Sequence, residues 1–127
     1  VVRDSAEWAR LWAADTGFMV RRSLLAGAAQ AGVLFDGHVQ WRGATDWRLR
    51  LGAAEAPLGA AAWSVVRGTA LPLLGDPDGR VRNGVAGVLA AWADSVSAPE
   101  ARATLRAMLE DEDFFARASA LSALASR

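Results

Sequence analysis

Residues 74–86 read LGDPDGRVRNGVA, and residues 109–121 read LEDEDFFARASAL. In both stretches an acidic turn leads to a small apolar residue, an arginine and a run of small residues. The two arginines, Arg82 and Arg117, lie 35 positions apart. A signature that recurs at such an interval is typical of repeated helical units. The two stretches therefore predict stacked copies of one helix pair.

The signature occurs twice more, at Arg21 and Arg50, and the intervals along the chain are 29, 32 and 35 positions. Three of the four arginines follow an aspartate by six positions, and these aspartates are Asp15, Asp76 and Asp111. The second copy departs from the pattern, because Asp46 stands only four positions before Arg50. A pair of this length cannot bury its own apolar face, so several copies must stack around a shared core.

The recurring aspartate and arginine predict a ladder along one edge of the stack. A turn aspartate can cap the second helix of its pair and also accept hydrogen bonds. Arginine is planar and multidentate, so it can bridge the turn carboxylates of adjacent copies. We therefore expect Arg21, Arg82 and Arg117 to be structural, while the rung of the second copy is in doubt because of the position of Asp46.

The chain of 127 residues suffices for one domain, residues 1–127. The repeats are expected at approximately 4–31, 33–58, 60–94 and 98–127. Within them, apolar spacing and capping signals predict helices at 18–31, 46–56, 60–74, 78–93, 99–109 and 114–126. Asp4 is a plausible cap for the first helix. Asp76 suits the N-cap position before Pro77, and Ser97 with Glu100 is typical of a capping box.

The first helix of the second copy should lie in residues 33–41, a segment that does not read well as a helix. Asp36-Gly37 is a turn signal between two apolar runs. Either this helix is short and broken, or a loop replaces it. Departures from a repeat pattern are places where functional residues tend to collect.

Residues 74–86 and 109–121, together with residues 49–56 for the second-helix half, resemble HEAT repeats, in particular the short bacterial HEAT-like repeats of the phycobilisome-lyase type. The resemblance covers about three quarters of the chain. It implies an all-α fold, an α-solenoid or α–α superhelix of about four helical hairpins with an irregular second repeat. It also implies a concave side lined by the second helices, used mostly to hold proteins or peptides. Fewer relatives hold nucleic acid or small molecules, or catalyse a reaction.

Composition excludes several classes of site. The chain has no cysteine and one histidine, so we expect no disulfide, no metal site and no cofactor. Fourteen basic residues balance fourteen acidic ones, which argues against a broad phosphate-binding surface and makes nucleic acid an unfavoured partner. No apolar run is long enough to span a membrane. All the basic residues are arginine, which with abundant alanine indicates a high-GC bacterial source, and the cytoplasm is the default compartment.

Three residues are candidates for acid–base chemistry. Glu55 lies in an otherwise apolar run and is expected on the concave side, where it can act as a general acid or base. His38 and Asp36 lie in the irregular segment, where the histidine can move protons near neutral pH. The alternative is that Glu55 is a solvated wall residue and His38 an exposed loop histidine.

Tryptophan and a few polar residues are candidates for binding. Trp41 and Trp47 flank the irregular segment and are expected at the rim of a ligand surface, since tryptophan combines apolar area with a polar N–H. The expected polar contacts of the concave side are Arg22, Ser23, Asn83 and Asp94, besides Glu55. The other tryptophans with an expected position, Trp8, Trp12, Trp63 and Trp92, fall on faces that should pack in the core.

The leading hypothesis is a non-catalytic binding or scaffold module that holds a partner protein or peptide. One alternative is an accessory or catalytic component of a bacterial biosynthetic pathway, with a Trp-lined small-molecule pocket around Glu55. A second alternative is damaged-DNA recognition, as in HEAT-like alkylation glycosylases. The last helix, residues 114–126, carries apolar side chains and little charge. It therefore predicts cover by further chain or by a second subunit.

Overall fold

The computed structural model describes residues 4–125, and all of the regular secondary structure in this range is helical. The α-helices are α1 (Ser5–Ala14), α2 (Phe18–Gln30), α3 (Asp36–Arg42), α4 (Trp47–Glu55), α5 (Trp63–Thr69), α6 (Gly79–Ala90), α7 (Pro99–Met108) and α8 (Phe114–Ala125). A 3-10 turn, η1 (Leu71–Leu73), follows α5. The expected all-α class is confirmed.

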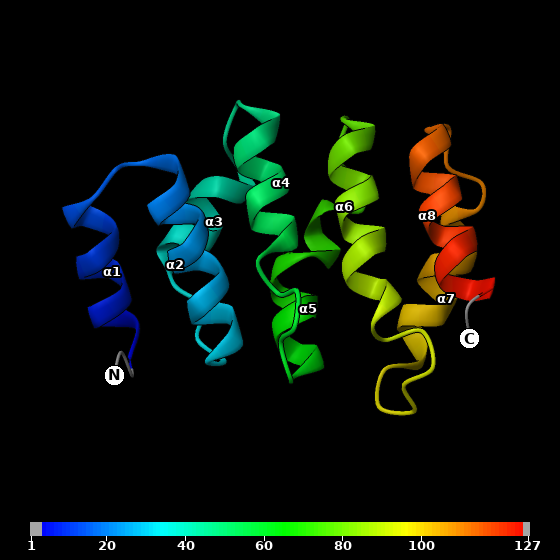
Figure 1. Ribbon diagram of the computed structural model, residues 1–127, viewed down its shortest axis with the longest axis horizontal. Coiled ribbons are helices and arrows are strands. Elements are labelled where there is room, and N and C mark those ends of the chain that lie inside the picture. The colour runs from blue at the N-terminus through cyan, green and yellow to red at the C-terminus, as the bar shows by residue number, and fades with distance from the viewer. Residues whose placement is uncertain (1–3, 126–127) are drawn as a thin grey trace.

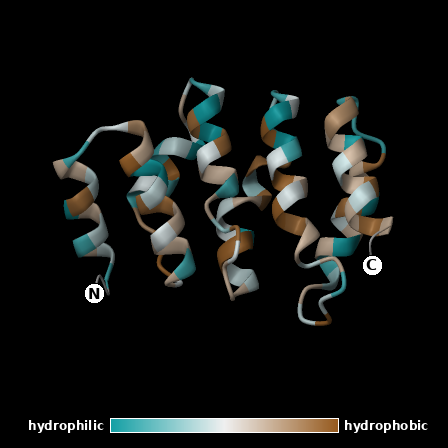
Figure 2. Ribbon diagram, in the orientation of Figure 1, coloured by the Kyte–Doolittle hydropathy of each residue, from teal (hydrophilic) through white to brown (hydrophobic). Residues whose placement is uncertain are grey.

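The helices follow one another along the long axis of the molecule, with α1 at one end and α8 at the other (Figure 1). The second helix of each expected pair, α2, α4, α6 or α8, packs against the next, so that α4 contacts both α2 and α6. The first helices α3 and α7 pack against α4 and α8. Hydrophilic residues gather at the upper ends of α4 and α6, beside the turns that lead into them (Figure 2).

The core runs along the whole row of helices rather than around one centre. Its fully buried side chains include Leu25 in α2, Val81 and Leu89 in α6, and Leu105 in α7. Small residues let neighbouring helices approach closely. A Cβ on Gly52 of α4 would lie 2.7 Å from the Trp41 ring. The small-residue runs of the sequence therefore serve packing.

The expected position of Trp41 at the rim of a ligand surface is wrong. It is buried, with its ring 5.6 Å from that of Trp12 and stacked on Phe18 at 5.3 Å between centroids. The large apolar area of the indole is worth more in this aromatic cluster than at an exposed rim. Trp12 and Trp63 are buried as expected, whereas Trp8 and Trp92 are half-buried.

The irregular segment contains a short helix, so the first of the two alternatives is correct. His38 therefore does not lie in an exposed loop, and this expectation is wrong. Its imidazole is buried, where Nδ1 accepts from the Phe35 N–H at 3.2 Å and Nε2 lies 3.0 Å from the Leu25 carbonyl oxygen. Because the backbone partners fix the roles, Nε2 carries the proton and donates. His38 thus caps the start of α3 and ties it to α2.

The long helix expected at 60–74 is also wrong, because Pro72 interrupts it. Proline has no N–H to bond to the carbonyl four residues earlier, which is that of Gly68. In the structure α5 ends at Thr69, and the Gly68 carbonyl accepts from Arg42 Nη1 at 3.3 Å instead. An arginine of the preceding pair thus satisfies the carbonyl that the proline leaves without its helical partner.

Two capping predictions are wrong and one is confirmed. Asp4 caps α1 by accepting from the Glu7 N–H at 2.9 Å, as expected. The N-cap of α6 is Asp78 rather than Asp76, and the N-cap of α7 is Ala98 rather than Ser97. The carboxylate of Glu100 turns away from a capping box to Arg67 and to the Trp63 N–H.

Candidate functional site

Two bidentate ion pairs join adjacent helix pairs along the edge where the turns lie. Arg50 Nε donates to Asp76 Oδ2 at 2.8 Å, and its Nη2 donates to Oδ1 at 3.3 Å. Arg82 holds Asp111 in the same way, with distances of 2.8 and 2.9 Å. The predicted ladder is therefore confirmed between the second and third pairs and between the third and fourth. Each rung joins an arginine to the turn aspartate of the next pair.

The arginine of each rung is also tied to its own turn. Arg82 Nη1 donates to the carbonyl of Asp76, six residues earlier, at 2.7 Å, and Arg50 Nη1 donates to the carbonyl of Ala44 at 3.0 Å. The aspartate is held as well, because Asp76 Oδ1 accepts from the N–H two residues later at 2.9 Å. Hydrogen bonds within its own turn therefore orient both the arginine and the aspartate of a rung.

The position of Asp46 is explained by this geometry. Asp46 is the N-cap of α4, where it accepts from the Arg48 N–H at 2.9 Å, just as Asp78 caps α6. The counterpart of Asp76 in the second pair is Ala44, which has no carboxylate. The absent rung is therefore the one between the first and second pairs, and the doubt about Arg50 is resolved in its favour.

Arg21 adapts to the absence of that carboxylate. Its Nη2 donates to the Trp12 carbonyl at 2.8 Å, its Nε donates to the Asp15 carbonyl at 3.0 Å, and its guanidinium carbon lies 4.3 Å from the Trp12 ring centroid. All three contacts lie within the first helix pair, and among the described residues no ion pair joins that pair to the second at this edge. The ladder arginines Arg50 and Arg82 are neutralised by carboxylates, which leaves them unsuited to bind phosphate.

The charges of the ladder shift the acidity of their partners. The hydrogen bond from Arg82 lowers the pKa of Asp111 below its ordinary value, against the opposing effect of burial. The hydrogen bond from Arg80 lowers the pKa of Asp78 to about 2. These carboxylates stay ionised at neutral pH and serve as acceptors, so the edge is structural rather than a source of protons.

A groove between α2 and α4 is the best candidate for a functional site. It encloses about 230 Å³ and is lined by Arg22, Ser23, Ala26, Gln30, Gly52, Glu55, Ala56 and Leu58. Three of the sequence-selected residues, Arg22, Ser23 and Glu55, therefore share one surface. The groove lies at the junction where the ladder rung is absent.

An ion pair crosses the groove. Arg22 Nη2 lies 3.6 Å from Glu55 Oε1, and the two side chains are 47 % and 29 % exposed. At this distance the pair is loose, and each group retains hydrogen-bonding capacity toward solvent or a ligand. Gly52, which has no side chain, and the methyl group of Ala56 line the groove beside Glu55. The groove therefore offers a donor, an acceptor and apolar area close together.

The only base among the residues that line the groove is the carboxylate of Glu55, and Arg22 is the only other ionisable residue there. No histidine lies beside Ser23 in the groove to activate it, and no hydrogen bond joins Ser23 to Glu55 in the described part of the chain. His38 is committed to backbone partners, and exposed Asp36 lines a different groove beside α1. The structure thus does not bring His38 and Asp36 into the groove of Glu55. Within residues 4–125, no cluster of metal-ligating side chains is found.

The remaining sequence-selected binding residues lie elsewhere. Asn83 accepts a hydrogen bond from the Ser119 hydroxyl and so links α6 to α8. Asp94 lies after α6, with Oδ1 at 3.6 Å from Arg102 Nη1. Half-buried Trp47 begins α4 beneath the Arg80 guanidinium, whose carbon lies 3.6 Å from a ring centroid of the indole. None of the three lines the groove between α2 and α4.

Sequence reasoning missed Gln30, Ala26 and Leu58 as parts of the groove. A signal for two of them is present, since Arg22, Ala26 and Gln30 recur at intervals of four and therefore share one face of a helix. Leu58 follows the end of α4 and had no comparable signal.

No protein-family model matches the chain, and searches of curated proteins and of solved structures also return no match. Over the part of the chain that the structure covers, no helix has the length and apolar character needed to cross a membrane.

Proposed function

We propose that this chain is a HEAT-like solenoid whose groove between α2 and α4 holds a segment of a partner polypeptide. Support for the repeat architecture comes from one turn geometry that recurs along the chain. An arginine reaches the carbonyl six residues earlier at Ala44, Asp76 and Asp111, in each case through Nη1. The alignment of these turns along one edge is what stacked copies of a helical hairpin require.

The observation that carries the binding proposal is the loose Arg22–Glu55 pair in an open groove. An extended peptide presents alternating N–H donors and carbonyl acceptors, and Glu55 accepts from the former while Arg22 donates to the latter. The amide of Gln30 adds one donor and one acceptor on the same helix face. Apolar side chains of the peptide would rest on Ala26 and Leu58. The groove thus matches a polypeptide better than a purely apolar or purely charged ligand.

The same features favour binding over the two alternatives. Small-molecule pockets usually enclose about 300–1,000 Å³, whereas this groove is smaller and open. A catalytic role would require a second proton-transfer group near Glu55, and none lines the groove. Duplex DNA requires several free cations, but Arg50 and Arg82 are held by carboxylates.

The test is a selection of random displayed peptides on the purified chain, followed by affinity measurement for the enriched sequences. We expect the Glu55→Gln and Arg22→Gln variants to bind these peptides about tenfold more weakly, since each loses a charge-assisted hydrogen bond of about 1.4 kcal/mol. Arg106→Ala is the matched control, because Arg106 is an exposed arginine of α7 outside the groove. Peptides that bind both groove variants as tightly as the parent chain would refute the proposal, and so would the absence of any enrichment.

A further inference from the structure

The last pair of helices presents half of a ladder rung. Arg117 Nη1 donates to the Asp111 carbonyl at 2.7 Å, the same bond that Arg82 makes to the Asp76 carbonyl at 2.7 Å. In Arg82 this bond directs Nε and Nη2 toward a carboxylate of the next pair. In Arg117 the same two nitrogens meet no carboxylate among residues 4–125. The guanidinium is thus oriented for a carboxylate that residues 4–125 do not supply.

The first pair presents the other half of the rung. Asp15 Oδ1 accepts from the Gly17 N–H at 2.8 Å. Asp76 and Asp111 make the same bond to the N–H two residues later, and both are gripped by an arginine. Asp15 thus makes the same local hydrogen bond as these two aspartates and is exposed, with no ion pair to any described residue. The first and last helix pairs therefore carry complementary charges at the positions that form a rung in the interior pairs.

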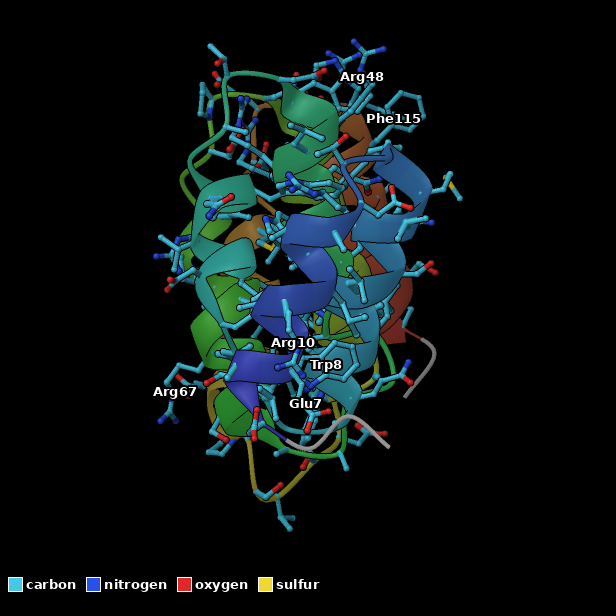
Figure 3. All side chains as sticks on the ribbon, turned by 90° about the vertical axis from the view of Figure 1, so that its left-hand side faces the viewer. Glu7, Trp8, Arg10, Arg48, Arg67 and Phe115 are labelled. Carbon is cyan, nitrogen blue, oxygen red and sulfur yellow. The ribbon has the colours of Figure 1, made fainter. Side chains whose placement is uncertain are left out.

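Apolar side chains accompany both half-rungs. At the last pair, Phe114, Phe115 and Leu121 are 65 %, 67 % and 59 % exposed. At the first pair, Met19 is 63 % exposed and Val20 42 %. Phe115 lies at the same upper edge of the molecule as Arg48 (Figure 3). Exposed apolar groups gathered beside oriented charges are typical of protein interfaces.

The interior register predicts how these apolar residues would meet. Trp47 stands three positions before Arg50, and it receives the side chain of Arg80, two positions before Arg82. The counterpart of Trp47 in the last pair is Phe114, and the counterpart of Arg80 in the first pair is Met19. A methionine sulfur against an aromatic ring is a favourable contact. The register that aligns Arg117 with Asp15 thus also brings Phe114 to Met19.

We propose that copies of this chain stack head to tail, with Arg117 of one copy gripping Asp15 of the next. The interface uses two different faces of the same chain, so it is heterologous and leaves a free half-rung at each end of every assembly. Association is therefore expected to be open-ended and to grow with concentration rather than to stop at a dimer. This interface is separate from the groove between α2 and α4.

The test is sedimentation velocity of the purified chain over a wide range of concentration. We expect the mean mass to rise with concentration, and we expect Arg117→Ala or Asp15→Ala alone to weaken the association about tenfold or more. An equimolar mixture of the two variants should form heterodimers and nothing larger. One variant retains the intact aspartate end and the other the intact arginine end, so a single sound junction remains. A symmetric interface would not give this result.

Arg106→Ala serves as the matched control and should assemble like the parent chain, since Arg106 is exposed on α7. Circular dichroism establishes that each variant is folded, and Met19→Glu replaces Asp15→Ala if the latter is not. A monomer at every concentration would overturn the proposal, and so would assembly that neither end variant weakens. The groove variants Glu55→Gln and Arg22→Gln should assemble normally, so failure of the binding proposal is distinguishable from failure of this one.

Discussion

The guanidinium of Arg50 grips the carboxylate of Asp76, 26 residues further along the chain, although Asp46 is much closer in sequence. Asp46 is used to cap α4 and to hold Arg48. The turn therefore divides two tasks between two aspartate positions, one that begins a helix and one that joins neighbouring pairs. This division organises the edge of the molecule.

Removing an interior rung should destabilise the fold strongly. In Arg82→Ala, Asp111 loses both donors of a pair whose side chains are only 11 % exposed each. Breaking a buried pair in this way costs about 3 kcal/mol, because the remaining charge is left without its partner. Chemical denaturation measures the change in the free energy of unfolding. The control Arg106→Ala should change that free energy by less than about 0.5 kcal/mol. Equal effects of the two substitutions would show that the rung contributes nothing.

Adding the absent rung should stabilise the fold. Ala44 occupies the position of Asp76 and Asp111, so Ala44→Asp supplies a carboxylate for Arg21 of the preceding pair. We expect a gain of about 1 kcal/mol in the free energy of unfolding, the usual net value of a hydrogen-bonded pair. Thr45→Asp is the matched control, since it adds the same charge one position out of register. If both substitutions have the same effect, Ala44 is not the counterpart of Asp76.

His38 should resist protonation in the folded chain. Burial lowers the pKa of its imidazole below 6.5, although the hydrogen bond to the Leu25 carbonyl acts in the opposite direction. The unfolded chain therefore binds a proton at His38 more readily than the folded chain. The contribution of neutral His38 to the free energy of unfolding is thus fully present above about pH 6.5 and is lost as the pH falls toward the folded-state pKa. The chain has one histidine, so a single imidazole signal in an NMR titration measures this pKa. Titration at or above 6.5 would contradict the prediction.

Two glycines should differ in their tolerance of a methyl group. A Cβ on Gly52 would lie 2.7 Å from the ring of buried Trp41, whereas a Cβ on Gly84 would meet a terminal methyl of Leu51 at 2.5 Å. The indole has no room to move, but the leucine can change rotamer. Gly52→Ala should therefore cost about 1–2 kcal/mol, and Gly84→Ala should be close to neutral because alanine favours the helix. Thermal or chemical unfolding of the two variants compares them, and an equal cost would exclude packing at Trp41 as the cause.

The all-helical class could be predicted from the recurring pair of a small apolar residue and an arginine. This pattern reflects helical periodicity and turn chemistry, and both depend on residues that are close in sequence. The rungs were also foreseeable, since arginine and aspartate at a fixed interval have few other uses. The sequence did not predict which of Asp76 and Asp78 caps α6, because both residues suit an N-cap. Asp76 binds Arg50 instead of capping the helix, and only the position of Arg50 in space decides this.

The candidate site was harder to foresee. Arg22, Ser23 and Glu55 were expected as polar residues of the concave side, and the structure brings them into one groove. Trp41 and His38 were misplaced because a tryptophan or histidine beside a turn signal suits exposure and burial equally well. Their burial depends on Trp12 and Leu25, which are distant in sequence. Contacts of that kind leave no trace in local spacing.

The presence of alanine at position 44, where the later helix pairs have Asp76 and Asp111, also has a mechanical consequence. The contacts of α4 with α6 and of α6 with α8 are each held by a bidentate ion pair, whereas the contact of α2 with α4 has only the loose Arg22–Glu55 pair at 3.6 Å. Bending or stretching of the molecule should therefore be concentrated at the joint between α2 and α4. Because the Arg22–Glu55 groove lies between α2 and α4, we expect its width to change more readily than the spacing of the other helices.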